Sequence, residues 1–232
     1  MKTLFLITAR GGSKGIPHKN LRPFCGKPLF LWSVDVARKL VGDEDICLST
    51  DDPEIIKTAE DYGLRVPFVR PPELATDTAS SGDVMIHAVK WYQEHGKDYD
   101  TMMLLQPTTP VRRAADVQRA IDLYDSSVEA VLGVTEARYA YNLLEQSATE
   151  DIVKPLFYAG GKYIRRQDSE MLYKVTGSIY MINVPEMLKR GFDSFDRFRK
   201  LVLPDEYGID IDTLQDWEYA EYLVRNGKVA IG

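Results

Sequence analysis

Short apolar runs alternate with amphipathic segments over most of the chain, and this alternation predicts the secondary structure. Six apolar runs are typical of buried strands, at residues 4–8, 46–50, 65–69, 101–105, 130–134 and 178–183. Helices are expected between or after them, at residues 29–40, 53–61, 81–95, 114–124, from 185 onward and at 213–224. This order predicts an α/β fold with a mostly parallel, doubly wound (Rossmann-like) sheet that carries helices on both faces.

Helix-capping residues stand near several of the expected boundaries. Pro28 suits the first turn of a helix, and the run Asp51-Asp52-Pro53 is expected to cap and start the next helix. Two later helices are expected to begin at Ser80 or Ser81 and at Asp212 or Thr213.

The alternation stops between residues 136 and 176, where the sequence is polar and irregular. Gly160 and Gly161 mark a turn inside this stretch, and tyrosines and arginines cluster around it. A loop this long inside a compact domain is usually functional or mediates an interaction. We find no internal repeat, low-complexity tract or interdomain linker, so residues 1–232 are expected to form a single domain with this segment inserted in it.

The composition narrows the possible classes of function. The chain has 232 residues and a formal net charge of −6, which argues against nucleic-acid binding, because nucleic-acid binders present basic surfaces. Cys25 and Cys47 are expected to be free thiols. No stretch approaches the ~20 apolar residues of a membrane helix, and the apolar run at the N-terminus is too short for a signal peptide. A cytoplasmic protein without nucleic-acid or membrane partners is expected.

Residues 8–20, at and after the end of the first strand, are rich in glycine, basic and hydroxyl-bearing residues. They contain three glycines, four basic or histidine side chains and two hydroxyls. Glycines let backbone amides close around an anion, while Arg10, Lys14 and Lys19 add positive charge. At the carboxyl end of a first strand, this composition favours a polyphosphate ligand. The alternative is a basic loop that contacts only water.

The loop matches neither of the two common nucleotide-binding motifs. It lacks Gly-x-x-x-x-Gly-Lys-Ser/Thr, because Lys14 precedes Gly15 and no hydroxyl follows them, and it also lacks Gly-x-Gly-x-x-Gly. The local chemistry therefore indicates a polyphosphate without specifying the nucleotide.

Two carboxylates, Asp210 and Asp212, stand two residues apart near the end of the chain. In an extended segment both side chains point to the same face. Mg²⁺ binds one or two carboxylates together with phosphate oxygens, so the pair is a candidate metal site. The alternative for Asp212 is to cap the last helix, but capping gives no role to Asp210.

Other polar residues stand where later strands are expected to end. Arg70 is followed by two prolines, and its position favours a ligand role over a surface ion pair. Gln106 can hydrogen-bond a base or a sugar, or it can hold a turn. Because no Gly-x-Ser-x-Gly motif and no Cys–His or Ser–His pair is visible, the site favours metal-assisted transfer of a phosphoryl-type group.

Several of these blocks carry a family resemblance when they are taken together. The loop at 9–20 is followed in order by residues 49–51, 70–75, 77–81, 104–110, 177–180 and 210–213. Together they resemble the acylneuraminate cytidylyltransferases, the CMP-sialic acid synthetases, over nearly the whole chain. The resemblance implies a fold of the nucleotidyltransferase type. It also implies transfer of CMP from CTP to the anomeric hydroxyl of a nonulosonic 2-keto sugar acid, with release of pyrophosphate.

The resemblance further implies roles for individual residues. The nucleotide is expected to contact Ala9, Arg10, Gly11, Gly12, Ser13, Lys14, Lys19, Asn20, Arg70, Ala79 and Ser81. The catalytic residues are expected to be Arg10, Lys19 and Asp212, the last of which helps to deprotonate the attacking hydroxyl. Asp210 and Asp212 are expected to hold Mg²⁺. The sugar is expected to contact Gln106, Arg166, Lys174 and Thr176. In the family the insert at 136–176 is a dimerisation arm that completes the partner's sugar site, so a homodimer is expected.

The sugar half of the chain departs from the family pattern. Members with sialic acid activity commonly carry Phe-Arg-Pro-Asn-Gly where this chain has Tyr-Lys-Val-Thr-Gly at residues 173–177. Lys174 in place of arginine loses the bidentate fork for a carboxylate, and Thr176 has a shorter polar reach than asparagine. The acceptor is therefore expected to be a sialic-acid-like acid such as a legionaminic or pseudaminic acid. The alternatives are an eight-carbon keto sugar acid as acceptor, or a catalytically silent relative that binds CTP.

Overall fold

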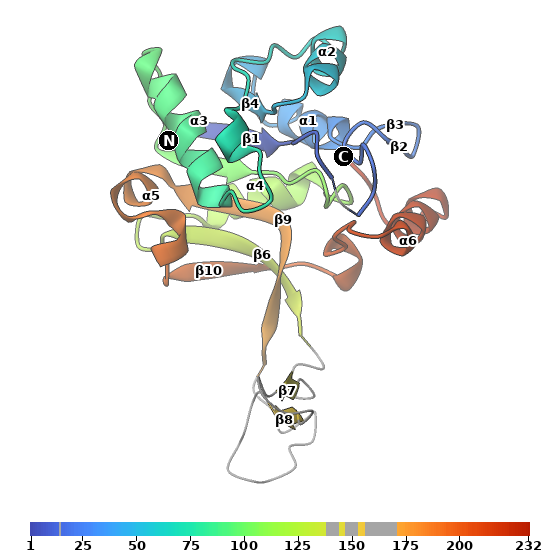
Figure 1. Ribbon diagram of the computed structural model, residues 1–232. Helices are drawn as coiled ribbons and strands as arrows, with labels where there is room; N and C mark the ends of the chain where they lie inside the picture. Colours follow the sequence, from blue (N-terminus) through green and yellow to red (C-terminus); the bar gives the residue numbers. More distant parts are fainter. Residues whose placement is uncertain (14, 138–143, 147–152, 156–170) are drawn as a thin grey trace.

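A six-stranded sheet forms the centre of the protein, in the order β10-β6-β9-β5-β1-β4 (Figure 1). The computed structural model describes residues 1–13, 15–137, 144–146, 153–155 and 171–232. The sheet strands are β1 (Thr3–Thr8), β4 (Ile46–Ser49), β5 (Thr101–Leu104), β6 (Ala130–Glu136), β9 (Tyr173–Asn183) and β10 (Phe198–Val202). β1 pairs in parallel with β4 and β5, and β6 pairs in parallel with β10. Only β9 runs antiparallel to its neighbours within this sheet, so the predicted mostly parallel α/β fold is confirmed.

Helices cover both faces of the sheet. Side chains alternate along a strand, so in β1 Phe5 and Ile7 face one side while Leu4 and Leu6 face the other, and all four are fully buried. The helices on the first face are α1 (Leu31–Arg38), α2 (Pro53–Asp61) and α4 (Ala114–Leu123). Those on the second face are α3 (Ser81–Glu94) and α5 (Val184–Arg190). Short 3₁₀ helices lie at η1 (Asp43–Asp45), η2 (Pro72–Leu74), η5 (Phe192–Ser194) and η6 (Asp205–Tyr207).

A third apolar cluster holds α6 (Leu214–Arg225) against the rest of the molecule. Trp217 of α6 packs edge-on against Phe24, with ring centroids 5.4 Å apart. The same cluster contains Ile16, from the loop after β1, and Ile211, from the segment before α6. It therefore fixes in one place the two segments that carry the glycine-rich loop and the paired carboxylates.

The helix caps predicted from the sequence are present. Asp52 Oδ1 accepts hydrogen bonds from two backbone amides at the start of α2, and Ser80 Oγ accepts one from Asp83 N at 3.0 Å. At α6 the cap is Thr213, which forms a reciprocal capping box with Asp216. The Asp212 carboxylate is therefore not used as a cap.

Two expected elements differ in the structure, and one strand was not expected. The first helix begins at Leu31, because Pro28 belongs to the small hairpin of β2 (Pro23–Phe24) and β3 (Lys27–Pro28). Residues 65–69 form no strand, and Val69 alone makes a bridge to Thr50. β10 was not expected because most of its side chains are charged or exposed, and Leu201 is its one buried residue.

The predicted insert starts where β6 and β9 stop pairing, at Glu136 and Tyr173. Within it, β7 (Leu144–Gln146) and β8 (Val153–Pro155) pair as an antiparallel ribbon. Most of the remaining insert lies outside the described residues, so the arm and its dimerisation role stay predictions. Cys25 and Cys47 are free thiols, as expected. In the described part of the chain, no helix is long and apolar enough to span a membrane.

Candidate active site

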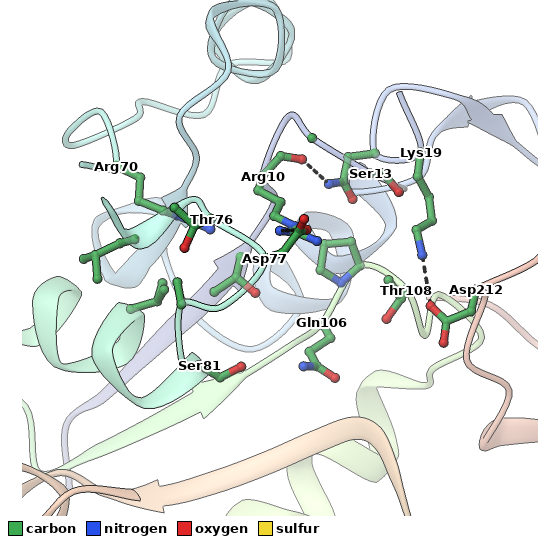
Figure 2. A pocket seen from close by; sticks show the side chains of 17 residues that line it. Arg10, Ser13, Lys19, Arg70, Thr76, Asp77, Ser81, Gln106, Thr108 and Asp212 are labelled. Carbon is green, nitrogen blue, oxygen red and sulfur yellow. Dashed lines mark hydrogen bonds and ion pairs between the residues drawn. The ribbon is translucent and has the colours of Figure 1, made fainter. Parts of the chain in front are cut away.

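A cavity of about 340 Å³ lies at the carboxyl ends of β1 and β5 (Figure 2). In Figure 2, Arg70 and Ser81 stand on one side of it, and Lys19 and Asp212 stand on the other. The predicted site residues that line the cavity are Arg10, Gly12, Ser13, Lys19, Asn20, Arg70, Ala79, Ser81, Gln106 and Asp212. The topology thus brings residues more than 200 positions apart in sequence to one hollow at the sheet edge, as expected for a doubly wound fold.

The loop after β1 makes close contacts at two of its glycines, with a side chain at Gly11 and with backbone at Gly15. A Cβ atom on Gly11 would lie 2.5 Å from Asp52 Oδ2, and one on Gly15 would lie 2.4 Å from the carbonyl oxygen of Asp212. Gly11 N also donates a hydrogen bond to Asp51 Oδ1 at 3.1 Å. The loop is therefore packed between the end of β4 and the segment before α6.

Arg10 and Asn20 define the wall of the cavity nearest this loop. Asn20 Nδ2 donates to the carbonyl oxygen of Arg10 at 3.0 Å and so ties the two ends of the loop together. The Arg10 guanidinium pairs with Asp77 at 2.8 Å, and both side chains are partly exposed (Figure 2). Arg10 is thus held at the cavity by a contact that a triphosphate can replace.

Lys19 joins the loop to the carboxylate segment. Its ammonium donates to the carbonyl oxygen of Ile211 at 2.7 Å and lies 3.2 Å from Asp212 Oδ1. The lysine side chain is largely buried, whereas that of Asp212 is 72% exposed and faces the cavity. The cation is therefore fixed in place beside a carboxylate that solvent and ligands can reach.

Arg70 supplies a buried cation on the opposite side. Its Nε donates to Ser49 Oγ at 3.0 Å, and its Nη2 donates to the Ser49 carbonyl oxygen. Burial lowers the pKa of Arg70, and the nearby charge of Arg10 lowers it further, while Asp51 opposes the shift. Ser49 thus orients the guanidinium of Arg70, a residue that is 4% exposed and lines the cavity.

Asp210 and Asp212 flank Ile211, whose side chain is fully buried. This alternation turns both carboxylates away from the core, as the period of an extended segment predicts. Partial desolvation raises the pKa of Asp210 and the neighbouring Asp212 carboxylate adds to the rise, whereas Thr108, Lys19 and Lys174 oppose it. The described residues contain no group of three or more potential metal ligands. Two oxygen donors fit a hard cation that completes its coordination with phosphate oxygens and water.

Gln106 faces the cavity from the loop after β5. Its Oε1 lies against Gly177 of β9, where a Cβ atom would come within 2.8 Å of that oxygen and 3.9 Å of Asp210 Oδ2. Gly177 also has a φ of +76°, a left-handed conformation that favours glycine. The amide of Gln106 can therefore lie against β9, on the side of Gly177 that also faces Asp210, because position 177 carries no side chain.

Several predicted residues do not line the cavity, and Asp210 is one of them. The Thr176 hydroxyl lies 3.0 Å from the Gly133 carbonyl oxygen and 2.6 Å from Ser178 Oγ, within the sheet. Lys174 is exposed on β9, near enough to influence the pKa of Asp210. The backbones of Ala9 and Gly11 support the loop through bonds to the end of β4. Lys14 and Arg166 lie outside the described residues.

The cavity also contains residues to which the sequence assigned no role. Leu74 and Val84 add apolar wall beside Ala79, and Thr76 and Asp77 add polar groups. Thr108 follows Gln106, and its carbonyl oxygen accepts a hydrogen bond from Ile211 N at 2.7 Å. Their residue types are ordinary for loops and helix starts, and only their positions beside η2, at the start of α3 or in the loop after β5 could have indicated them.

A comparison with protein families identifies the family of this chain. Residues 4–229 match the model of the cytidylyltransferases. The chain therefore belongs to the cytidylyltransferase family and is a nucleotidyltransferase enzyme. Cytidylyltransferases that use CTP generally use a divalent metal ion.

Three curated relatives indicate the kinds of activity found in similar chains. The chain is 33% identical over 230 residues to a pseudaminic acid cytidylyltransferase of Campylobacter jejuni, covering 97% of both chains. It is 29% identical over 233 residues to a CMP-N,N'-diacetyllegionaminic acid synthase of Legionella pneumophila, covering both completely. It is 30% identical over 220 residues to an N-acylneuraminate cytidylyltransferase of Streptococcus agalactiae, covering 94% of this chain and 52% of the relative.

A solved structure supports the fold. The structure of CMP:2-keto-3-deoxy-manno-octonic acid synthetase complexed with CTP matches with a TM-score of 0.68 at 18% identity. The match covers 98% of this chain and 100% of the other. The nucleotidyltransferase type of fold implied by the sequence is thereby confirmed.

Proposed function

We propose that the protein transfers CMP from CTP to the anomeric hydroxyl of a nonulosonic 2-keto sugar acid and releases pyrophosphate. The observation that carries this proposal is the cavity, which has the cations Arg10, Lys19 and Arg70 in its wall and a carboxylate, Asp212, at one side. Family membership supports the use of CTP. The full-length similarity to enzymes named for pseudaminic and legionaminic acids supports the class of acceptor.

In this reaction the hydroxyl oxygen of the sugar attacks the α-phosphorus of CTP. A new phosphorus–oxygen bond forms, and the bond from the α-phosphorus to the bridging oxygen breaks. Pyrophosphate leaves with the bonding electrons, and the hydroxyl proton passes to Asp212, directly or through water. Reactions of this kind are accelerated mainly by positioning and by neutralisation of developing charge.

We propose that amides of the loop after β1, together with Arg10 and Lys19, bind the triphosphate and stabilise the leaving pyrophosphate. The cytidine lies toward the other side, where Arg70, Ala79 and Ser81 meet an apolar wall. This assignment is supported by the burial of Arg70 and by its fixed contact with Ser49, because a pre-oriented cation gives specificity at low entropic cost.

Asp210 and Asp212 would hold Mg²⁺, which when bound neutralises charge on the phosphate that is attacked. Two carboxylates with phosphate oxygens form a donor set that suits this ion. Lys19 keeps Asp212 in place through their 3.2 Å contact. On the acceptor side we propose that Gln106, Lys174 and Arg166 contact the sugar acid, and that Thr176 acts through the backbone shape of β9.

We further propose a homodimer formed through the insert at 136–176. The length of this insert within a compact domain supports the proposal. Light scattering after size exclusion tests it, because removal of residues 140–170 should convert a dimer to a monomer. A monomeric intact chain at micromolar concentration would contradict it.

Pyrophosphate release tests the enzymatic proposal. The assay combines the protein, CTP and Mg²⁺ with N-acetylneuraminic, legionaminic, pseudaminic or the eight-carbon keto sugar acid, one at a time. Turnover with a nine-carbon acid is expected. Turnover with the eight-carbon acid alone would replace the proposed acceptor, and CTP binding without turnover on any acid would indicate a silent relative.

A further inference from the structure

A buried arginine lies beneath the acceptor side of the cavity. Arg112, between the β5 loop and α4, is 2% exposed and is the largest fully buried side chain among the described residues. Burial lowers the pKa of Arg112 to about 9, and no carboxylate in the described part of the chain pairs with it. A charge buried in this way is costly unless its donors are satisfied. Its partners therefore need an explanation.

Those partners belong to three segments of the fold. Nε donates to the carbonyl oxygen of Ser178 on β9 at 2.6 Å. Nη2 donates to the carbonyl oxygen of Gln106 at 2.8 Å and to Thr109 Oγ1 at 2.9 Å. Nη1 donates to Ser33 Oγ of α1 at 3.1 Å. The planar fork thus fixes the loop after β5 relative to β9.

Thr109 continues this network toward the cavity. Its side chain is fully buried, and its hydroxyl lies 3.1 Å from the carbonyl oxygen of Gln106 and 3.4 Å from that of Gly177. Gly177 is the residue against which the Gln106 amide oxygen rests. The backbones on both sides of the Gln106 side chain are therefore held by one guanidinium and one hydroxyl.

We propose that Arg112 and Thr109 are positioning residues for the acceptor half of the site. They fix Gln106 and Gly177 so that the Gln106 amide stands where the sugar acid binds. Lysine cannot replace Arg112 in this role, because a single ammonium lacks the rigid fork that reaches Ser178, Gln106 and Thr109 together. This inference rests on the proposed function, in which Gln106 contacts the acceptor.

Matched single substitutions test the inference. Thr109→Val removes the hydroxyl on the site side of Arg112 at nearly constant volume, and Ser33→Ala removes the hydroxyl on the α1 side. Steady-state kinetics are measured with the acid that gives turnover, CTP binding is measured by calorimetry without acceptor, and melting temperatures are recorded. We expect Thr109→Val to lower kcat/KM for the acceptor about tenfold, which corresponds to one hydrogen bond, and to change the CTP Kd less than twofold. Arg112→Lys should lower kcat/KM for the acceptor further than Thr109→Val does.

The control should separate positioning from stability. Ser33→Ala is expected to lower the melting temperature about as much as Thr109→Val while changing kcat/KM for the acceptor less than twofold. Equal kinetic losses in both variants, or an equal loss of CTP affinity, would overturn the inference.

Hydrogen exchange separates this inference from the proposed function, because it needs no substrate. Amides in residues 104–110 and 176–180 should exchange faster in Thr109→Val than in the wild type or Ser33→Ala. If no acid in the panel gives turnover, the proposed acceptor fails while this exchange pattern still supports Arg112 and Thr109 as the residues that order Gln106. Unchanged exchange in Thr109→Val would refute that role.

Discussion

Gly15→Ala is the substitution whose effect the structure defines most sharply. The new Cβ atom would lie 2.4 Å from the backbone carbonyl oxygen of Asp212, whereas ordinary contacts of this kind begin at 3.4 Å. The loop and the carboxylate segment must therefore separate by about 1 Å. Both are backbone, so no flexible side chain can absorb the shift.

Two magnitudes follow from this displacement. Overpacking of this size costs about 1–3 kcal/mol of stability, which for a chain of this length lowers the melting temperature by roughly 2–4 °C per kcal/mol. The larger effect is catalytic, because the shift also disturbs the contacts of Lys19 with Ile211 and Asp212. A misplacement of about 1 Å can reduce turnover about 100-fold.

Pyrophosphate release and a thermal melt measure both effects, with Gly96→Ala as the control. Gly96 lies after α3 with a φ of +78° and no atom near its Cβ position, so alanine there is strained without a clash at the site. It should lower the melting temperature and leave kcat/KM unchanged. Wild-type kcat/KM in Gly15→Ala would refute the close packing of the loop on Asp212.

Three other substitutions probe the charges of the cavity. Asp212→Asn should leave the melting temperature and most of the CTP affinity intact, because the side chain is 72% exposed, but lose most turnover; near wild-type pyrophosphate release would remove Asp212 from the mechanism. Ser49→Ala should raise the KM for CTP about fivefold by loosening Arg70, since one hydrogen bond contributes about 1 kcal/mol, and an unchanged KM would show that the backbone bond suffices. Asp77→Asn should tighten CTP binding by up to about fivefold by releasing Arg10 from an exposed ion pair, with a gain that shrinks as salt is added; weaker binding in calorimetry would show that Asp77 supports the nucleotide.

Elements whose formation is decided locally could be predicted from the sequence. The caps at Asp52 and Thr213 depend on a side chain and the amides two or three residues away, so their pattern is visible in the chain itself. β10 could not be predicted, because its one buried residue, Leu201, leaves no alternating pattern and pairing with β6 makes it a strand. Tertiary contacts likewise decide the conformation of residues 65–69. They form a single bridge, from Val69 to Thr50, and therefore no strand.

In the candidate site, too, some residues could be predicted from the sequence and others could not. Arg10 and Arg70 could be predicted because they stand just beyond the ends of apolar runs, where a doubly wound sheet collects ligands, and Lys19 because it belongs to the glycine-rich basic loop that follows the first run. Arg112 could not, because it belongs to a dibasic pair before a helix, which by composition is a surface feature. Its burial arises only when the β5 loop, β9 and α1 converge on it.

The two sides of the cavity therefore differ in what holds them, and this difference explains why the sequence describes one side better. The part of the cavity proposed to bind the triphosphate is built from a continuous loop whose glycines permit close contacts, as at Gly11 and Gly15. Such contacts demand particular residue types and leave a recognisable pattern. The part proposed to bind the acceptor is held by buried polar groups beneath it, so a residue there can affect activity without touching substrate. Thr176 is an example, since its hydroxyl is committed to Gly133 and Ser178 within the sheet. Threonine in place of the family's asparagine at position 176 therefore changes the shape of β9 as well as the side chain offered to the acceptor.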